Sequence, residues 1–322
     1  MTKALIIGGG GMVGQKLAYA LATDPDQTVT LFDIAFPESG APAAKTVHGT
    51  VTDAALIKDL IADHPDVIYH LAAIVSGEAE VDFELGWQIN MHAFWTFLDA
   101  LKDAHDDSGG SYVPRVVFTS SIAVFGAPFP EKIDDDFLRA PQTSYGAQKA
   151  ISELMLGDFS RKGFVDGISI RLPTICVRPG KPNKAASSFF SGIIREPLNG
   201  QEAILPVETD VRHWHASPRS AVGFLRHAAA LDTGLLDGRR ALNLPGISVT
   251  VEEQIEALRD EAGNGVVALI KKVPDPQITA IVAGWPRDFA PDRALALGFH
   301  ADPDFRTIIR TYIDDDLPKA PA

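Results

Sequence analysis

The sequence predicts an α/β protein built on a doubly wound parallel sheet, a Rossmann fold, with a smaller C-terminal substrate lobe. Two observations carry this prediction. Short, unbroken apolar runs alternate with longer helical patterns from residue 3 to about residue 173, and such strands are typical of a parallel sheet covered on both faces. The first apolar run also ends in the glycine-rich stretch GGGGMVG at 8–14, directly before a helical pattern.

The elements follow one another in the order that a doubly wound sheet requires. We expect strands at 3–8, 28–33, 66–73, 115–121 and 167–173, and helices at 11–23, 53–62, 82–105 and 144–161. After Pro173 the alternation ends in PTICVRPGKPNKAAS, and further helices are expected at 218–231 and 251–262. We therefore divide the chain into a dinucleotide-binding domain, 1–173, and a mainly substrate-binding lobe, 174–322, from which some segments return to the Rossmann core.

Composition excludes several classes of partner. The net charge of −13 and the pI near 5.1 argue against nucleic acid, which requires a positive surface. No stretch approaches the roughly 18 apolar residues of a membrane helix, so we expect a cytoplasmic protein without a membrane partner. The single cysteine, Cys176, fits a reducing compartment and is expected to be a buried structural thiol. The only close histidine pair, His213 and His215, lacks a third ligand nearby, so no metal is expected.

The glycine-rich stretch predicts a dinucleotide site. Gly8, Gly11 and Gly14 are spaced three apart, which permits a tight turn and places a pyrophosphate at the start of the following helix. Asp33 ends the next strand about 20 residues beyond the glycines, where a carboxylate accepts from the adenosine ribose and repels a 2′-phosphate. This favours NAD over NADP, although an Asp in this place can also begin a turn. Asp53 either caps the following helix or reaches the adenine.

The stretch TSYGAQK at 143–149 places Tyr145 and Lys149 four residues apart, on one face of a helix. An ordinary Tyr has a pKa near 10, too high for a base at neutral pH, and a nearby cation lowers it. The pair is therefore either a general base with its activating charge or a surface pair on a helix.

Taken together, five motifs resemble those of the extended short-chain dehydrogenases/reductases, a family that includes nucleotide-sugar epimerases. They are GGGGMVG, HLAA at 70–73, Asn90 in QINM, FTSSIAVFG at 118–126 and YGAQK at 145–149. The resemblance covers almost the whole chain. It implies that Tyr145 exchanges the proton of a substrate hydroxyl, that Lys149 lowers the Tyr145 pKa and holds the nicotinamide ribose, and that Ser121 hydrogen-bonds the reacting oxygen.

The resemblance also implies a cofactor site and a homodimer. The dimer would form through the helices at 82–105 and 144–161. The residues expected at NAD are Gly8, Gly11, Met12, Val13, Gly14, Asp33, Asp53, Leu71, Ala72, Ala73, Asn90, Tyr145, Lys149 and Pro173.

Departures from the family patterns reduce the number of reactions that the chain is expected to catalyse. Dehydratases carry an Asp-Glu pair directly after the catalytic Thr, where Ser121 is followed by Ile122 and Ala123, which argues against elimination. Sugar-nucleotide enzymes usually carry Asn where this chain has Thr174, which argues against an epimerase. HLAAIVSGEAEVDFELGWQINM at 70–91 instead resembles the short-chain type of L-threonine dehydrogenase, in which a Ser at the place of Ser76 contacts the acid end of the substrate.

A group within the family, the D-erythronate dehydrogenases, which oxidise a four-carbon sugar acid with NAD, is similar in three stretches. These are AAIVSGEAE, RLPTICVRPGKPN and RHWHASPRSAVGF. The last contains Arg212, whose guanidinium can grip a carboxylate or phosphate with two hydrogen bonds, or is simply a surface Arg. The residues expected at an anionic small-molecule substrate are Ser76, Ser121, Tyr145, Thr174, Arg178, Asn183 and Arg212.

We therefore predict NAD-dependent oxidation of a small sugar acid, with D-erythronate as the leading candidate and 2-dehydro-D-erythronate as its product. The alternatives are a nucleotide-sugar epimerase, a hydroxy acid dehydrogenase similar to L-threonine dehydrogenase, and a non-catalytic dinucleotide sensor. Intact Ser121, Tyr145 and Lys149 argue against the sensor. His213 and His215 would point the same way from a strand, and either help to bind the acid or pack at the lobe boundary.

Overall fold

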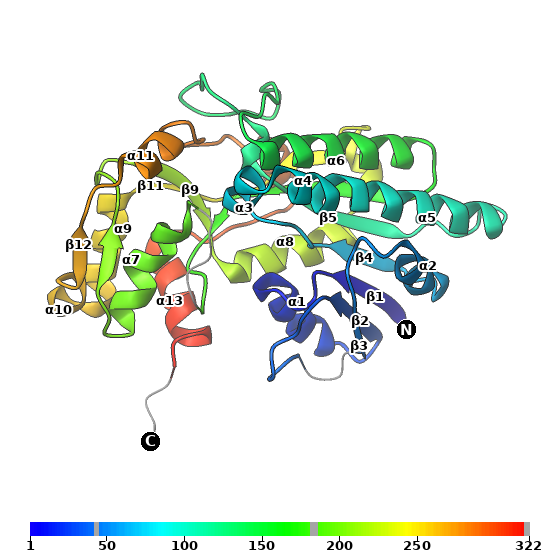
Figure 1. Cartoon of the computed structure of the whole chain (residues 1–322), viewed down its shortest axis with the longest axis horizontal. Helices are drawn as coiled ribbons and strands as arrows, with labels where there is room; N and C mark the ends of the chain where they lie inside the picture. Colours follow the sequence, from blue (N-terminus) through cyan, green and yellow to red (C-terminus); the bar gives the residue numbers. More distant parts are fainter. Residues whose placement is uncertain (42–44, 181–185, 319–322) are drawn as a thin grey trace. The chain divides into compact units, whose positions relative to one another are not determined.

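The computed structural model describes residues 1–41, 45–180 and 186–318, which form two compact units (Figure 1). The first unit comprises Met1–Val124, Pro141–Leu172 and Val222–Asn243, and the second comprises Phe125–Ala140, Pro173–Ala221 and Leu244–Ala322. Each unit has its own sheet structure and hydrophobic core.

A seven-stranded parallel sheet forms the centre of the first unit, in the order β10-β6-β5-β4-β1-β2-β3. Its strands are β1 (Thr2–Ile7), β2 (Gln27–Asp33), β3 (Lys45–His48), β4 (Val67–His70), β5 (Arg115–Ser121), β6 (Asp166–Leu172) and β10 (Ala241–Asn243). The chain winds from β1 outward to β3 and then returns to β4 on the other side of β1, so the strand order reverses between β1 and β4. The predicted doubly wound fold is confirmed.

Helices cover both faces of this sheet. They are α1 (Met12–Ala22), α2 (Ala54–Ala62), α3 (Ser76–Val81), α4 (Phe83–Trp87), α5 (Ala93–Asp107) and α6 (Ser144–Arg161), and α8 (Pro218–Ala230) runs along the chain from the second unit into the first. Side chains of α2, α5 and α6 share one buried cluster with Leu5 and Ile7 of β1. Ala4 and Ile6 alternate with these two residues and are also buried, so they point to the opposite face, where Figure 1 shows α1. Throughout the described parts of the chain, no helix is long and apolar enough to cross a membrane.

The structure differs from the prediction in several elements of the first unit. The expected helix at 82–105 is interrupted, because a π-helical turn at Gln88–His92 joins α4 to α5; such turns are often found at functional sites. The strands β3 and β10 are not predicted. β3 is mostly exposed and β10 has only three residues, so neither produces an apolar run long enough to recognise.

The second unit contains two small sheets, ordered β11-β9-β7 and β12-β8. The strands are β7 (Thr174–Ile175), β8 (Ala203–Leu205), β9 (Arg212–Ala216), β11 (Ile247–Thr250) and β12 (Ile270–Lys272). The helices are α7 (Ser188–Leu198), α9 (Val251–Ala262), α10 (Asn264–Val267), α11 (Pro276–Ala283), α12 (Asp292–Ala296) and α13 (Phe305–Asp315). Side chains of α7, α9 and α13 form a buried core with Cys176.

Cys176 is fully buried in this core, which confirms the prediction of a buried thiol. Its Sγ donates to the carbonyl oxygen of Phe190 at 3.4 Å. Burial raises the pKa of the thiol to about 12. Because the thiolate is the reactive form, Cys176 is an inert structural side chain at neutral pH.

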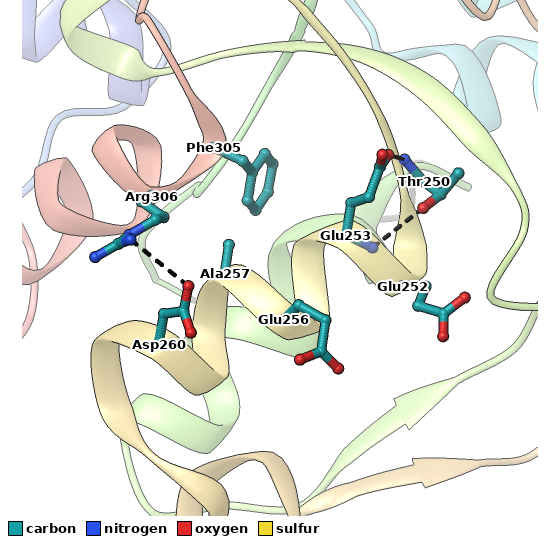
Figure 2. A pocket seen from close by; sticks show the side chains of 8 residues that line it. All are labelled: Thr250, Glu252, Glu253, Glu256, Ala257, Asp260, Phe305 and Arg306. Carbon is teal, nitrogen blue, oxygen red and sulfur yellow. Dashed lines mark hydrogen bonds and ion pairs between the residues drawn. The ribbon is translucent and has the colours of Figure 1, made fainter.

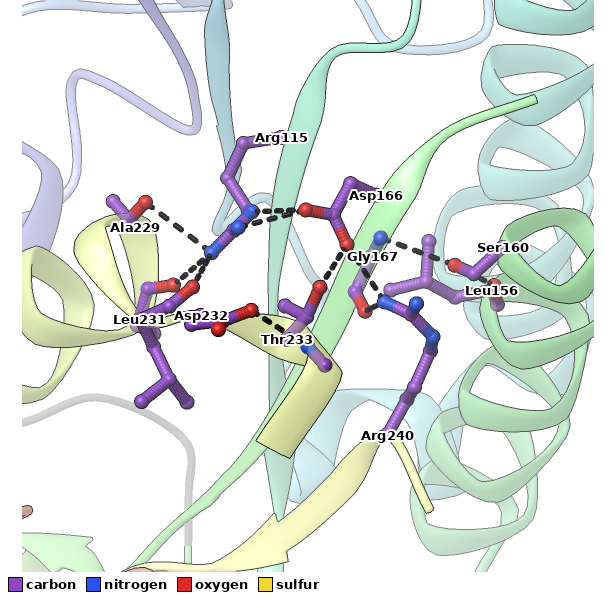
Figure 3. A network of polar contacts seen from close by, with 12 residues as sticks. Arg115, Leu156, Ser160, Asp166, Gly167, Ala229, Leu231, Asp232, Thr233 and Arg240 are labelled. Atoms are coloured by element: carbon purple, nitrogen blue, oxygen red, sulfur yellow. Dashed lines mark hydrogen bonds and ion pairs between the residues drawn. The ribbon is translucent and has the colours of Figure 1, made fainter. Parts of the chain in front are cut away.

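A network of charged side chains joins the N-terminal ends of β5 and β6 to the end of α8 (Figure 3). Arg115 donates from Nη2 to Asp166 Oδ2 at 2.7 Å and from Nη1 to the carbonyl oxygen of Leu231 at 2.7 Å. The other oxygen of Asp166 accepts from Thr233 Oγ1 at 2.5 Å and from Arg240 Nη1 at 2.8 Å. Burial alone would raise the pKa of Asp166, but these hydrogen bonds and the charge of Arg115 together hold it below its ordinary value.

We expect Asp166→Asn to lower the free energy of unfolding by about 2–3 kcal/mol at pH 7, because Arg115 and Arg240 lose a shared carboxylate. The pKa of Asp166 is lower in the folded chain than in the unfolded one, so its contribution is present above the unfolded pKa and is lost as pH falls through the folded value. Urea unfolding from pH 7 down to pH 3 measures this. A difference between variant and wild type that does not shrink in acid would contradict it.

Candidate active site

The glycine turn after β1 is packed so tightly that side chains do not fit. Gly8 has a φ of +92°, and a Cβ there would lie 2.6 Å from the backbone nitrogen of Ala72. A Cβ on Gly14 would lie 2.3 Å from the carbonyl oxygen of Gly8. Gly11 is the N-cap of α1 and contributes no capping side chain, so Met12 and Val13 begin a helix whose N-terminal end suits an anion such as a pyrophosphate.

Asp33 lies beside this turn at the end of β2. Its Oδ2 accepts from the backbone nitrogen of Gly10 at 2.9 Å, and its Oδ1 accepts from that of Ile34 at 2.7 Å. A Cβ on Gly10 would lie 1.9 Å from the carbonyl oxygen of Ala35. Gly10 is thus required for this close approach, which holds the carboxylate where the ribose next to a pyrophosphate is expected.

Asp53 is the N-cap of α2. Its Oδ1 accepts from the backbone nitrogens of Ala55 and Leu56, both at 3.1 Å. The capping alternative is therefore what the structure shows. A contact with the adenine stays a prediction.

The segment after β4 is held against β1 and the π-helical turn. The backbone nitrogens of Leu71 and Ala72 both donate to the carbonyl oxygen of Ile7, at 2.8 and 3.0 Å. Asn90, in the π-helical turn, accepts from the Ile74 nitrogen at 2.8 Å and donates to the Ile74 oxygen at 3.0 Å. Asn90 therefore positions the backbone that follows Ala72 and Ala73, and its predicted contact with NAD stays a prediction.

Tyr145, Ser121 and Lys149 are brought together at the start of α6. A Cβ on Gly146 would lie 2.1 Å from the carbonyl oxygen of Ala123, so only glycine lets the helix come this close to the turn that follows β5. Ser121 lies close enough to Tyr145 for its side chain to lower the Tyr145 pKa. Lys149 is 2% exposed; its Nζ donates to the Thr119 carbonyl oxygen at 2.8 Å and lies 5.6 Å from the centre of the Tyr145 ring.

The pKa of Tyr145 moves in the direction opposite to the one expected from Lys149. Burial raises it to about 12, and the nearby Ser121 side chain offsets this only in part. The physical reason is that desolvation disfavours the phenolate and also the ammonium: burial lowers the pKa of Lys149 to about 7. Burial therefore opposes the charge of Lys149 as well as that of a Tyr145 phenolate. The spacing along the helix indicates that Tyr145 and Lys149 are near one another, but it does not reveal how burial changes their pKa values.

A buried ion pair next to Lys149 is missing from the prediction. Glu153 lies one turn beyond Lys149 on α6, and its carboxylate accepts from Arg171 Nε and Nη2, each at 2.8 Å, and from Ser120 Oγ at 2.6 Å. Its charge raises the pKa of Lys149 against the larger effect of burial. The i+4 spacing from Lys149 is the sequence signal that could have identified it.

The expected substrate residues fall in both units. Ser76, in the first unit, is the first residue of α3. In the second unit, Arg178 donates from Nη2 to Ser187 Oγ at 3.1 Å. Arg212 donates to the Ser248 carbonyl oxygen at 2.9 Å and pairs with Glu253 at 3.2 Å. The predicted site residues that complete the set are buried Pro173, half-buried Thr174, and Asn183, which lies outside the described residues.

His213 and His215 lie on one side of β9, as predicted. Their ring centres are 5.2 Å apart, and both rings contact Phe190, at 5.1 and 4.8 Å. Both side chains are buried, and desolvation lowers their pKa values, that of His213 to about 4. They are neutral at pH 7. In the described parts of the chain, no group of three or more His, Cys, Asp or Glu side chains could hold a metal ion.

A pocket in the second unit lies along α9 and near the start of α13 (Figure 2). Four carboxylates line it, those of Glu252, Glu253, Glu256 and Asp260, together with Thr250, Ala257, Phe305 and Arg306. None of these is a predicted substrate residue. Because the carboxylates outnumber the single Arg306, the pocket repels an anionic acid.

Comparison with known proteins identifies a family and two similar dehydrogenases. Residues 4–225 match the model of the "NAD dependent epimerase/dehydratase family". A D-erythronate dehydrogenase of Cupriavidus necator is 44% identical over 97% of this chain and 98% of its own length. A D-erythronate dehydrogenase of Haemophilus influenzae is 41% identical over 98% of this chain and 100% of its own length.

Two solved structures are also similar. A structure described as a nucleoside-diphosphate-sugar epimerase from Agrobacterium tumefaciens is 52% identical, with a TM-score of 0.93, and the match covers 98% of this chain and 94% of the other. The L-threonine dehydrogenase of Clostridium difficile has a TM-score of 0.86 at 22% identity, with 98% of this chain and 97% of the other covered. At that identity the second likeness shows a shared fold alone.

Proposed function

Because the chain belongs to the NAD dependent epimerase/dehydratase family, we propose that it oxidises D-erythronate to 2-dehydro-D-erythronate with NAD. The observation that carries this proposal is the identity of 41–44% with two D-erythronate dehydrogenases over nearly the whole chain. Membership of the family confirms the prediction of NAD as the cofactor. NAD supplies an acceptor for the hydride that leaves the substrate carbon.

The glycine turn fits NAD. A Cβ at Gly8, Gly10 or Gly14 would clash with backbone atoms at 2.6 Å or less, so the turn is built for close approach of its backbone. Gly8, Gly11, Met12, Val13 and Gly14 would hold the pyrophosphate at the start of α1. Asp33 would bind the adenosine ribose, and the segment of Leu71, Ala72 and Ala73 would line the cofactor.

The chemistry requires one proton acceptor and one hydride acceptor. As the C2–H bond breaks and its electron pair leaves as hydride, the C2 hydroxyl loses its proton and the C2–O bond becomes a carbonyl. Tyr145 would take that proton, and Ser121, whose side chain is near enough to lower the Tyr145 pKa, would hold the reacting oxygen. In its charged form, Lys149 would stabilise the phenolate of Tyr145.

The substrate carboxylate requires cationic partners. Arg178 and Arg212 in the second unit are the candidates. The current partners of Arg212, the Ser248 carbonyl oxygen and the partly exposed Glu253, leave its ion pair open to exchange for a stronger bidentate contact, because exposed ion pairs contribute little. Ser76 is a further candidate, from α3 of the first unit.

A substrate panel tests the proposal against its rival. D-erythronate, other four- to six-carbon sugar acids, L-threonine and a nucleotide sugar are incubated with NAD, and NADH absorbance and product chromatography are recorded. We expect the highest kcat/KM with D-erythronate. The likeness to a structure described as a nucleoside-diphosphate-sugar epimerase supports the rival; turnover of the nucleotide sugar without reduction of NAD by any acid would establish that rival instead.

We expect Asp33→Ser to raise the KM for NAD and to lower the KM for NADP, each by about tenfold, because the variant loses the ribose acceptor and the repulsion of a 2′-phosphate. The matched control is Asp59→Ser, which removes an exposed carboxylate from α2. Steady-state kinetics with both cofactors measure the effect. Equal KM values in variant and wild type would place Asp33 outside the ribose site.

Two further predictions concern the oligomeric state of the protein and its location in the cell. From the family resemblance, we propose a homodimer that forms through α4–α5 and α6. Light scattering, which measures the mass of the particle in solution, tests this. A cytoplasmic location is also proposed; the single cysteine, Cys176, fits a reducing compartment, and cell fractionation tests the location.

A further inference from the structure

The hydrogen bonds of His213 determine which of its two ring nitrogens carries the proton. The ring is 2% exposed, and Nδ1 lies 3.0 Å from the carbonyl oxygen of Pro286. A carbonyl oxygen can only accept, so Nδ1 must donate. Because burial keeps the imidazole neutral at pH 7, Nε2 carries no proton and can only accept.

The acceptor nitrogen of His213 in turn fixes the hydroxyl of Thr174. Nε2 lies 2.7 Å from Thr174 Oγ1, so the Thr174 hydroxyl donates its single proton to the ring. The ring cannot easily turn away: it is stacked on Phe190 at 5.1 Å and contacts Trp285 at 5.3 Å. Toward any other partner, Thr174 Oγ1 can therefore only accept hydrogen bonds through its lone pairs.

The position of Thr174 along the chain makes it a candidate ligand residue. It follows Leu172, the last residue of β6, by two positions, and Leu172 is paired with Ser121 across the sheet. In doubly wound sheets, ligands bind at the carboxyl ends of the strands. The side chain of Thr174 is half-buried, whereas that of His213 is buried.

We propose that Thr174, with its proton held by His213, recognises a substrate hydroxyl group and rejects the substrate carboxylate. This inference rests on the proposed function and adds the orientation of the sugar acid. A substrate hydroxyl at C3 or C4 can donate a hydrogen bond to Thr174 Oγ1. A carboxylate can only accept hydrogen bonds, so its oxygens and Oγ1 would repel one another. His213 is a positioning residue that acts through Thr174.

The test compares wild type and a Thr174 variant on D-erythronate and on two substrates that each lack one hydroxyl group. Wild type and Thr174→Val are compared by kcat/KM on D-erythronate, on 2,3-dihydroxybutanoate, which lacks the C4 hydroxyl, and on 2,4-dihydroxybutanoate, which lacks the C3 hydroxyl. We expect Thr174→Val to lower kcat/KM on D-erythronate by about tenfold to a hundredfold, the value of one buried hydrogen bond. On one of the two deoxy acids, variant and wild type should be equal, because the donor is already missing. Thr174→Ser should restore most of the loss.

His213 is tested by its dependence on Thr174. His213→Phe keeps an aromatic ring beside Phe190 and Trp285 but releases the Thr174 proton, so kcat/KM on D-erythronate should fall. The double variant His213→Phe/Thr174→Val should be no worse than Thr174→Val alone. Circular dichroism melting establishes that each variant is folded, and the Thr174→Val comparison stands alone if His213→Phe is not.

Two results would overturn the inference while the proposed function survives. One is unchanged kcat/KM of Thr174→Val on D-erythronate, and the other is an equal loss on all three acids, which indicates a general structural effect. Absence of D-erythronate turnover by the wild type is distinguishable from both and would overturn the proposed function together with this inference.

Discussion

We expect Tyr145→Phe to lower kcat for D-erythronate by about 10²- to 10⁴-fold, the usual effect of losing a general acid–base group. The variant keeps the buried ring and loses only the phenolic oxygen, whose pKa the nearby Ser121 side chain lowers. The fold and the affinity for NAD should therefore survive. Stopped-flow and steady-state absorbance of NADH measure kcat, and fluorescence titration with NAD measures the affinity for the cofactor.

The matched control is Tyr19→Phe, which removes the same atom from an exposed tyrosine of α1. It should leave kcat unchanged. If Tyr145→Phe kept the wild-type kcat, Tyr145 would be a packing residue, and the mechanism proposed above would lose its proton acceptor.

We expect Lys149→Met to lower kcat by on the order of 10²-fold, the effect of removing one preorganised charged donor, and also to weaken NAD binding. The reason is that Lys149 is the cation next to Tyr145, with its Nζ 5.6 Å from the ring centre, and is expected to hold the nicotinamide ribose. Steady-state kinetics and NAD titration measure the two effects. Loss of kcat without any change in NAD affinity would contradict the ribose contact.

The same variant tests the burial of the Lys149 charge. An unfolded lysine keeps its proton to about pH 10.4, whereas burial lowers the pKa of folded Lys149 to about 7. Between these values the folded chain binds fewer protons than the unfolded chain, so the Lys149 contribution to stability rises with pH. The urea midpoint of the wild type, measured relative to that of Lys149→Met, should therefore rise from pH 7 to pH 9. A constant difference would show that Lys149 titrates normally.

The fold could be predicted because its signals are local in the sequence. Gly8, Gly10 and Gly14 have no room for a Cβ, and unbroken apolar strands follow from burial on both faces of the sheet. β3 lacks such a signal, because it is a short and mostly exposed edge strand. The spacing of Tyr145 and Lys149 predicted that they share one face of a helix, for the same local reason.

The electrostatics could not be predicted, because they depend on groups distant in the sequence. Burial of Tyr145 and Lys149 reverses the expected direction of the Tyr145 pKa. The ion pair of Arg212 with Glu253 joins residues that are brought together by the pairing of β9 with β11. The tautomer of His213 depends on the carbonyl oxygen of Pro286, 73 positions away.

The most direct test of the proposed function uses D-erythronate with deuterium at C2. The enzyme is incubated with this substrate and NAD, and the reduced cofactor is analysed by mass spectrometry. If hydride leaves C2 to produce 2-dehydro-D-erythronate, the reduced cofactor is one mass unit heavier than that formed from unlabelled substrate. Reduced cofactor of ordinary mass would show that another carbon is oxidised, and no reduced cofactor at all would show that D-erythronate is not the substrate.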